Sequence, residues 1–206
     1  NGETRQFVPA EYSIKNDLYS QNQIDFIDKY LNGLFKIVYE ACENGKYYKF
    51  DENYDLVDSD VTTAEEAVSN VMDIDSVRDM YILYEIVHDY DCGEGSFYMC
   101  VDLSKGSKCP KLKFTSPWDF NWAYNDSTEK YYAGAFTDKN FVAKNGDRSN
   151  PWFIVLCKQD WFMDTVKEKW TEMSQEKLLQ GCIKTEREYL KEYDADLRKG
   201  EEWGPD

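Results

Sequence analysis

Apolar residues at helical spacing predict a long helix near the start of the chain. They recur three or four positions apart, which places them on one face of a helix: Ile24, Ile27, Leu31, Leu34, Phe35 and Val38. Just before them, Ser20 followed by Gln23 resembles a capping box. We therefore expect a helix over about residues 21–43, with its apolar face on a core.

Two further helices are predicted in the first half of the chain. Thr63, with Glu66 three positions later, is typical of a helix start, and this helix is expected to end at about Met72. Asp75 starts a third helix, which we expect to continue to about Asp89. The apolar positions of this third helix are Met80, Ile82, Leu83, Ile86 and Val87.

The pattern then changes from helical to β. The segments GSFYMCVDL and PKLKFTS are rich in strand-forming residues, and the turn-like segment SKGSKC separates them. This order predicts an antiparallel hairpin over about residues 96–115.

The C-terminal part is again helical. Asn150 followed by Pro151 indicates a helix start, because the N–H that proline lacks has no partner at the first helical position. Asp160 opens another helix, and Ser174 begins a long polar helix that we expect to end at about Lys199.

The order of these elements predicts the fold class. Residues 125–149 are rich in Asn, Asp, Gly and Ser and are expected to be irregular. The chain shows no repeat and no clear linker. We therefore predict one mainly helical α+β domain over residues 1–206, with a small antiparallel hairpin.

The polar segment GKYYKFDENYDLVDSD is predicted to be a loop, and its acids resemble the start of a calcium loop. Oxygen ligands alternate from Asp51 onward, as in an EF-hand. However, Leu56 replaces the glycine that the turn needs, and Thr62 replaces the bidentate glutamate. Asx turns and helix capping explain these acids more simply.

Charge limits the partners that the chain can have. It carries 40 acidic and 24 basic residues, for a formal charge of −16. Nucleic-acid binding needs clustered Lys and Arg, so this balance argues against a nucleic-acid partner. Solubility explains the acidic surface most simply, although a cationic substrate or a divalent metal also fits it. No apolar run approaches the length of a membrane span.

Cysteine and histidine usage excludes several kinds of site. The six cysteines contain no C-x-x-C pair, which argues against a zinc site and a thioredoxin-type motif. The spacing of Cys92, Cys100 and Cys109 allows one disulfide among them. Free buried cysteines agree equally well with the sequence. The single histidine, His88, excludes a histidine-rich metal site, an H-E-x-x-H protease and a Ser-His-Asp triad with spare partners.

Two aspartates have the order seen in phosphotransferases. Asp91 is followed five positions later by Ser96, and after the predicted hairpin comes Asp119-Phe120-Asn121. Protein kinases use D-x-x-x-x-N followed by D-F-G, in which one Asp orients the attacking hydroxyl and the other holds Mg²⁺. Taken alone, these acids are better explained as a helix C-cap and a turn.

The sequence resembles the spore-coat protein H (CotH) kinase family over roughly the whole chain. The pieces that carry this resemblance most strongly lie between about Met72 and Trp170. They are DIDSVRDMYILYEIVHDYD, GSFYMCVD, FTSPWDFNWAY and NPWFIVLCKQDWFMDTVKEKW.

The resemblance implies an atypical protein-kinase-like fold and transfer of phosphate from ATP, with Mg²⁺, to serine or threonine of a partner protein. It implies that Asp91 is the catalytic acid and Asp119 the metal ligand, with Ser96 or Asn121 completing the cofactor site. In this sequence Asn121 replaces the second Asp of the family's W-D-x-D box, and Ser96 stands where many members have Asn.

The resemblance also implies that the chain is a C-terminal lobe. We find no Gly-rich loop and no strand lysine in a suitable context among residues 1–20, where Lys15 is the only weak candidate. We therefore expect the N-terminal nucleotide lobe to be absent from this chain, and expect little activity from the chain alone. The family's setting favours an exported or cell-surface location.

Two other functions stay open. Asn121 and Ser96 are compatible with a non-catalytic, pseudokinase-like scaffold. An exposed face containing Trp118 and Trp122 would instead favour a module that binds glycan or protein by stacking.

Burial is predicted for most of the tryptophans and for one acid. We expect Trp118, Trp122, Trp152 and Trp161 to lie in the core, since tryptophan is mostly buried. Glu85 lies among apolar neighbours on the third predicted helix, and we expect it to pair with Arg78 or with a backbone donor.

Overall fold

The computed structural model describes residues 12–87, 92, 96–122 and 150–201. The chain divides into two compact units, residues 1–164 and 165–206, and the boundary falls within one helix. The prediction of a single domain over residues 1–206 stays a prediction.

The first helix, α1 (Gln21–Asn44), confirms the predicted element and its apolar face. Leu34, Ile37 and Val38 are fully buried on that face. The capping box does not form: the Ser20 side chain caps nothing, and the Gln23 side chain accepts a hydrogen bond from the N–H of Tyr19, the residue before the N-cap, at 2.7 Å.

The segment predicted as a polar loop forms a short antiparallel hairpin instead. Its strands are β1 (Tyr48–Phe50) and β2 (Leu56–Asp58), which pair in register from Tyr48 with Asp58. In its turn, the Asp51 carboxylate accepts hydrogen bonds from the N–H groups of Asn53 and Asp55, each at 2.8 Å. These bonds confirm the Asx turn that we expected in place of a calcium loop.

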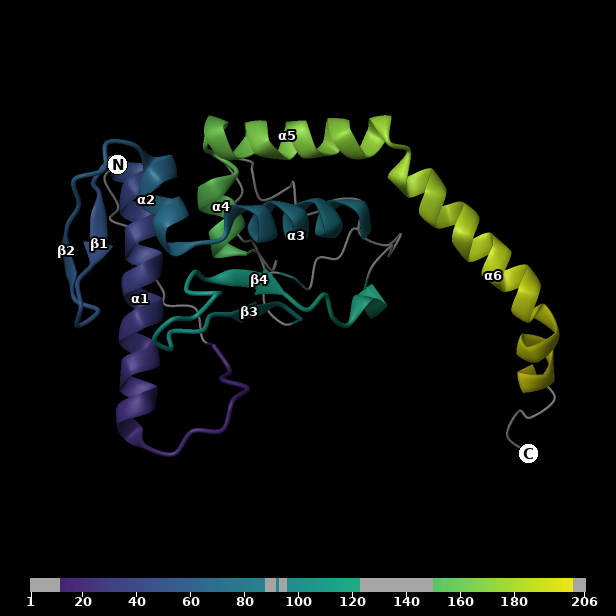
Figure 1. The fold of residues 1–206 in the computed structure, drawn as a ribbon, viewed down its shortest axis with the longest axis horizontal. Helices are drawn as coiled ribbons and strands as arrows, with labels where there is room; N and C mark the ends of the chain where they lie inside the picture. The colour runs from purple at the N-terminus through teal and green to yellow at the C-terminus, as the bar shows by residue number, and fades with distance from the viewer. Residues whose placement is uncertain (1–11, 88–91, 93–95, 123–149, 202–206) are drawn as a thin grey trace, which may run out of the picture. The chain divides into compact units, whose positions relative to one another are not determined.

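The hairpin lies against α1 because one helix residue has no side chain. A Cβ at Gly33 would meet Phe50 at 2.8 Å, closer than carbon atoms normally approach. The Phe50 ring also stacks on Tyr30 of α1 with a centroid distance of 5.4 Å. In Figure 1 the hairpin, α1 and α2 lie together.

The next two helices are confirmed with small shifts. In α2 (Ala64–Val71) the Thr63 hydroxyl accepts from the Glu66 N–H at 3.2 Å, while the Glu66 carboxylate accepts from the Thr62 N–H at 3.2 Å. Helix α3 (Ile74–Val87) begins one residue before Asp75, because the Asp73 carboxylate accepts from the Ser76 N–H at 3.0 Å. The predicted end at Asp89 lies outside the described residues.

The predicted hairpin is confirmed as β3 (Tyr98–Cys100) and β4 (Lys113–Thr115), paired antiparallel. Figure 1 shows β4 beside α3. The Phe114 N–H of β4 donates to the Ser76 hydroxyl at 3.2 Å, and the Phe114 side chain is buried. The hairpin is therefore fixed to α3 by both its backbone and its apolar face.

Two further helices complete the described part of the first unit and reach the boundary. Helix α4 (Pro151–Leu156) has Asn150 as its N-cap, as predicted, and α5 (Asp160–Gln175) begins at the expected Asp160. Trp152 of α4 packs edge-on against Phe35 of α1 at a centroid distance of 4.9 Å. The core is thus shared by α1, α3, α4 and β4, and the class is mainly helical α+β, as predicted.

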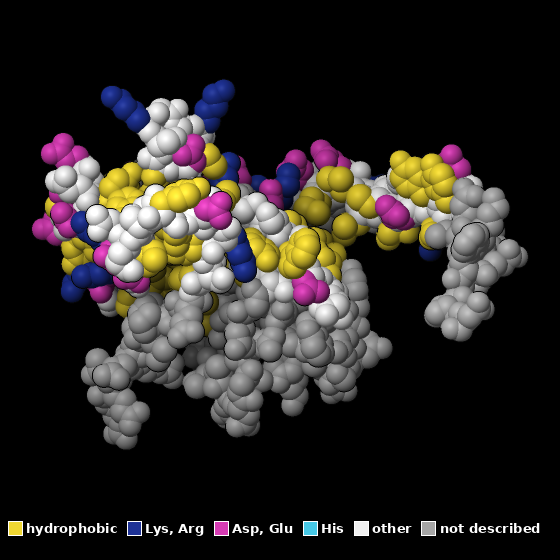
Figure 2. All heavy atoms as spheres, turned by 90° about the horizontal axis from the view of Figure 1, so that it is seen from below, with side chains coloured by type: hydrophobic (Ala, Val, Ile, Leu, Met, Phe, Trp, Pro, Cys, Tyr) yellow, Lys and Arg dark blue, Asp and Glu magenta, His cyan; other side chains and the backbone are white. Residues whose placement is uncertain are grey.

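In the second unit, α6 (Leu178–Glu201) starts later than predicted. Ser174 lies inside α5, and Lys177, with φ of +53°, interrupts the helix between α5 and α6. Apolar side chains are exposed along α6, and Figure 2 shows them beside acidic and basic ones. They are Leu178, Ile183, Tyr189, Leu190 and Tyr193.

Two other predictions concern the described residues as a whole. All six cysteines are free thiols, and Cys92 and Cys157 are buried. Across the described ranges, no helix combines the length and the apolar character that a membrane crossing requires.

Candidate functional site

The four predicted site residues fall on two segments that flank the β3–β4 hairpin. Ser96 precedes β3, and Asp119 and Asn121 follow β4. Asp91 lies outside the described residues, so its distance from Asp119 stays a prediction.

Ser96 is held by the helix that precedes it in the chain. Its backbone carbonyl accepts a hydrogen bond from the Tyr84 hydroxyl at 3.4 Å. Tyr84 lies on α3 and is fully buried, and Ser96 itself is only 9% exposed. The entry to β3 is thus attached to the core of the first unit.

Cys92, the residue after Asp91, is attached to a different helix. Its carbonyl accepts a hydrogen bond from the Asn150 side-chain amide at 3.0 Å. The oxygen of the same amide accepts from the N–H groups of Trp152 and Phe153, at 3.0 and 3.3 Å. The sequence predicts Asn150 only as a helix start. It does not indicate that the Asn150 side chain also bonds the Cys92 carbonyl.

Asp119 lies on a tight turn between β4 and a single turn of 3₁₀-helix, η2 (Phe120–Trp122). Its φ of +61° is in the left-handed region, as is that of Ser116 at +55°. Aspartate tolerates this conformation better than most residues, yet such strain concentrates at functional sites. Asp119 and Asn121 are both exposed, so their side-chain oxygens are accessible from solvent.

Phe120 connects this turn to the other half of the site. Its ring lies 6.2 Å from the ring of Tyr84, centroid to centroid. Tyr84 also contacts Phe97, at 6.2 Å, and donates to the carbonyl of Ser96. A single buried tyrosine therefore contacts both segments that carry the predicted site residues.

The tryptophans do not all follow the prediction. Trp152 is 1% exposed and lies in the core, as expected, and Trp161 is partly buried. Trp118 is 60% exposed, so the prediction that it lies in the core is wrong. In this turn, where Ser116 and Asp119 have positive φ, Phe120 makes the contact with the core instead, against Tyr84. The Trp122 side chain lies outside the described part of the structure.

Glu85 is a partly buried acid on the last turn of α3. It does not pair with Arg78, as one of our expectations had it, because Arg78 binds Asp75 at 2.7 Å and Asp79 at 2.9 Å. Burial raises the pKa of Glu85 to about 6, although a hydrogen bond with Tyr81 opposes the increase. One carboxylate oxygen, Oε1, is buried and has no hydrogen-bond partner within the described residues.

Cys157 of α4 belongs to the same cluster. Burial raises the pKa of its thiol to about 12, against a hydrogen bond with Tyr81 that lowers it. A thiol with so high a pKa is a weak nucleophile at neutral pH. We therefore assign Cys157 to packing, not to chemistry.

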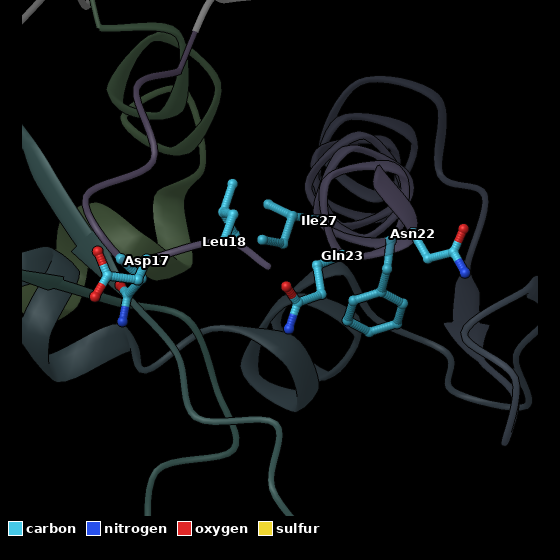
Figure 3. Close-up of a pocket in the computed structure, with 7 residues that line it drawn as sticks. Asp17, Leu18, Asn22, Gln23 and Ile27 are labelled. Atoms are coloured by element: carbon cyan, nitrogen blue, oxygen red, sulfur yellow. The ribbon is translucent and has the colours of Figure 1, made fainter. Parts of the chain in front are cut away.

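A surface hollow lies elsewhere, between the segment before α1 and the first turns of that helix (Figure 3). Leu18, Phe26 and Ile27 supply its apolar lining. None of the predicted site residues lines it.

The donor set at the turn after β4 suits a hard cation. Asp119 offers a carboxylate and Asn121 an amide oxygen at this turn, while the Ser96 hydroxyl lies on the other site segment, before β3. Mg²⁺ is commonly bound by one or two carboxylates together with substrate phosphates and water, so a larger cage is not required. In the described ranges, no group of three or more His, Cys, Asp or Glu side chains forms such a cage.

Comparison with known families agrees with the motifs. The family model described as CotH kinase protein matches residues 24–199. Comparisons with curated proteins and with solved structures gave no match. The match covers most of the chain, including both site segments and the helices that hold them. The chain belongs to the CotH kinase protein family.

Proposed function

We propose that the chain is the kinase-like C-terminal lobe of an enzyme that transfers phosphate from ATP to serine or threonine of a protein. Asp91 orients the attacking hydroxyl and accepts its proton. Asp119 holds Mg²⁺, assisted by Ser96 or Asn121.

The contact of Tyr84 with both site segments carries this proposal. Phosphoryl transfer needs the hydroxyl-orienting acid and the metal-binding acid at one place, because its catalysis is almost entirely positioning and charge stabilisation. Tyr84 contacts the ring of Phe120, next to Asp119, and the carbonyl of Ser96, in the loop that follows Asp91. Family membership supplies the reaction class.

In this proposal Asp119, Phe120 and Asn121 have different roles at the site. Mg²⁺-ATP, when bound, supplies the phosphoryl group and offsets the charge that develops during its transfer. The left-handed turn at Asp119 exposes its carboxylate, while Phe120 packs inward and fixes the turn to α3. Asn121 contributes a neutral oxygen where a carboxylate would add negative charge.

Phosphate transfer from radiolabelled ATP by the full-length protein tests this proposal. Asp91→Ala and Asp119→Ala should each lower the rate at least about 100-fold, because each removes a group used in the transition state. Asp58→Ala, at an exposed aspartate that ends β2, is the matched control and should retain the wild-type rate. Undiminished transfer by either site variant would contradict the assignment.

A second candidate is a surface that binds protein or glycan. The 60% exposure of Trp118, directly beside Asp119, is the observation that favours it. Loss of partner binding in Trp118→Ala, with no phosphate transfer by the wild-type protein, would support this function. Mg²⁺-dependent ATP binding that Asp119→Ala abolishes, without transfer, would instead identify a pseudokinase.

A further inference from the structure

One buried amide joins two parts of the chain that are far apart in sequence. The Asn150 side chain donates to the Cys92 carbonyl at 3.0 Å and accepts from the N–H groups of Trp152 and Phe153, at 3.0 and 3.3 Å. Asn150 is 2% exposed and Cys92 is fully buried. Every bond thus lies in a place where water cannot easily replace it.

Only an amide meets both requirements at this position. Capping α4 needs an acceptor oxygen, which Ser, Asp and Asn all provide. Bonding the Cys92 carbonyl needs a donor at the same time, which an ionised carboxylate lacks. Asn150 makes these bonds with two separate atoms, Nδ2 and Oδ1, whereas serine has a single oxygen. The Asn150 side-chain NH₂ therefore binds the segment that contains Cys92, whereas the side-chain oxygen caps α4.

We propose that Asn150 is a positioning residue for Asp91: it fixes the carbonyl of Cys92, the residue after the proposed catalytic acid, to the N-terminal end of α4. This inference rests on the proposed function, since it takes Asp91 as the group that orients the hydroxyl. The 3.4 Å bond from Tyr84 to the Ser96 carbonyl is a second, longer attachment of the same loop. Catalysis of phosphoryl transfer depends on such positioning.

Two substitutions separate the bond from Asn150 to the Cys92 carbonyl, here called the tether, from the capping of α4. Asn150→Asp has nearly the same shape and keeps the cap acceptor, but it places a carboxylate against the Cys92 carbonyl. Asn150→Ser keeps a capping oxygen and introduces no charge, which guards against misfolding of the first variant. Thr63→Ala removes the cap of α2 instead and is the control for cap loss without loop release.

The readouts are backbone hydrogen exchange and steady-state kinetics of the full-length protein. Both Asn150 variants should speed exchange in residues 88–96 by about tenfold or more, while the Trp152 and Phe153 amides stay protected by the remaining cap. The kcat for phosphate transfer should fall about 10- to 100-fold, the usual effect of removing a supporting hydrogen bond, with the KM for ATP little changed. Thr63→Ala should leave exchange in residues 88–96 and kcat at wild-type values.

Three outcomes are decisive. Unchanged exchange in residues 88–96 overturns the tether, whatever the activity. Faster exchange with an unchanged kcat overturns the positioning role. Faster exchange in the variants of a protein whose wild type transfers no phosphate leaves the tether standing and overturns the proposed function.

Discussion

Asn121 is the residue that replaces the second Asp of the W-D-x-D box by which the sequence resembles its family. Its side chain is exposed two residues after Asp119, so a carboxylate there would add negative charge close to the proposed Mg²⁺ ligand. We predict that Asn121→Asp tightens the apparent Mg²⁺ affinity about tenfold, because each added carboxylate strengthens the attraction of a hard cation. Titration of phosphate transfer, or of ATP binding, with Mg²⁺ measures the change.

The control for this substitution adds the same charge elsewhere. Asn53→Asp lies in the turn between β1 and β2 and should leave the Mg²⁺ dependence unaltered. Equal Mg²⁺ affinities for the wild type and for Asn121→Asp would show that this side chain does not face the metal.

Glu85 makes stability depend on pH. Burial raises the pKa of its carboxyl from 4.5 to about 6 in the folded protein, so the folded state binds a proton more tightly than the unfolded state does. The contribution of the protonated Glu85 carboxyl to the free energy of unfolding is therefore fully present below about pH 4.5. It is lost as the pH rises through about 6. Above that pH the folded protein must bury part of a charge.

Glu85→Gln removes this dependence, because the amide stays neutral and can still accept from Tyr81. We predict that the variant melts at a higher temperature than the wild type at pH 8, and that the difference disappears near pH 5. Thermal melts across this range measure it, with Glu52→Gln in the exposed β1–β2 turn as the control. A difference that does not vary with pH would mean that the wild-type carboxyl does not titrate in this interval.

At the scale of elements, the reciprocal cap of α2 should contribute measurably to stability. Thr63→Ala leaves the Glu66 N–H without its acceptor and should lower the free energy of unfolding by about 1 kcal/mol. Thr63→Ser keeps the hydroxyl and should cost much less. Urea denaturation of both variants measures the difference, and equal losses would mean that the hydroxyl does not stabilise the helix.

The sequence predicts the helices whose apolar spacing or capping residues lie within one continuous stretch of the chain. The spacing from Ile24 to Val38 fixes one face of α1, and Thr63 with Glu66 marks the start of α2, because the groups that satisfy the first turn lie next to it in sequence. The β1–β2 hairpin differs from the predicted loop because neither of its strands has a buried residue, so no alternation of buried and exposed positions marks them. Its stability comes from packing on α1, which local pattern does not reveal.

The break between α5 and α6 was misplaced for a related reason. It occurs at Lys177, whose positive φ is unusual for a residue with a side chain, so neither glycine nor proline marks it. Trp118 was misassigned because its exposure depends on the turn that follows β4, not on its own type. At the candidate site, spacing and family resemblance selected Asp119, Ser96 and Asn121, whereas only the fold reveals the roles of Tyr84 and Asn150.

At the scale of the whole molecule, the net charge bears on the choice of partner, and the division into two compact units bears on the location of the site. The formal charge of −16 leaves nucleic acid an unfavourable partner, a prediction that the fold does not test. Residues 1–164 contain both site segments and the helices that hold them, so the proposed chemistry belongs to one compact unit. The exposed apolar side chains of α6 belong to the other unit.

The bond between Asn150 and Cys92 also has a consequence for folding. It joins residues 58 positions apart, so forming it closes a long loop and carries a matching entropic cost. During synthesis the segment with Asp91 leaves the ribosome well before Asn150 does. The bond to Cys92 therefore cannot form until Asn150 has been synthesised, and a chain arrested after the β3–β4 hairpin lacks this attachment of the segment that contains Cys92.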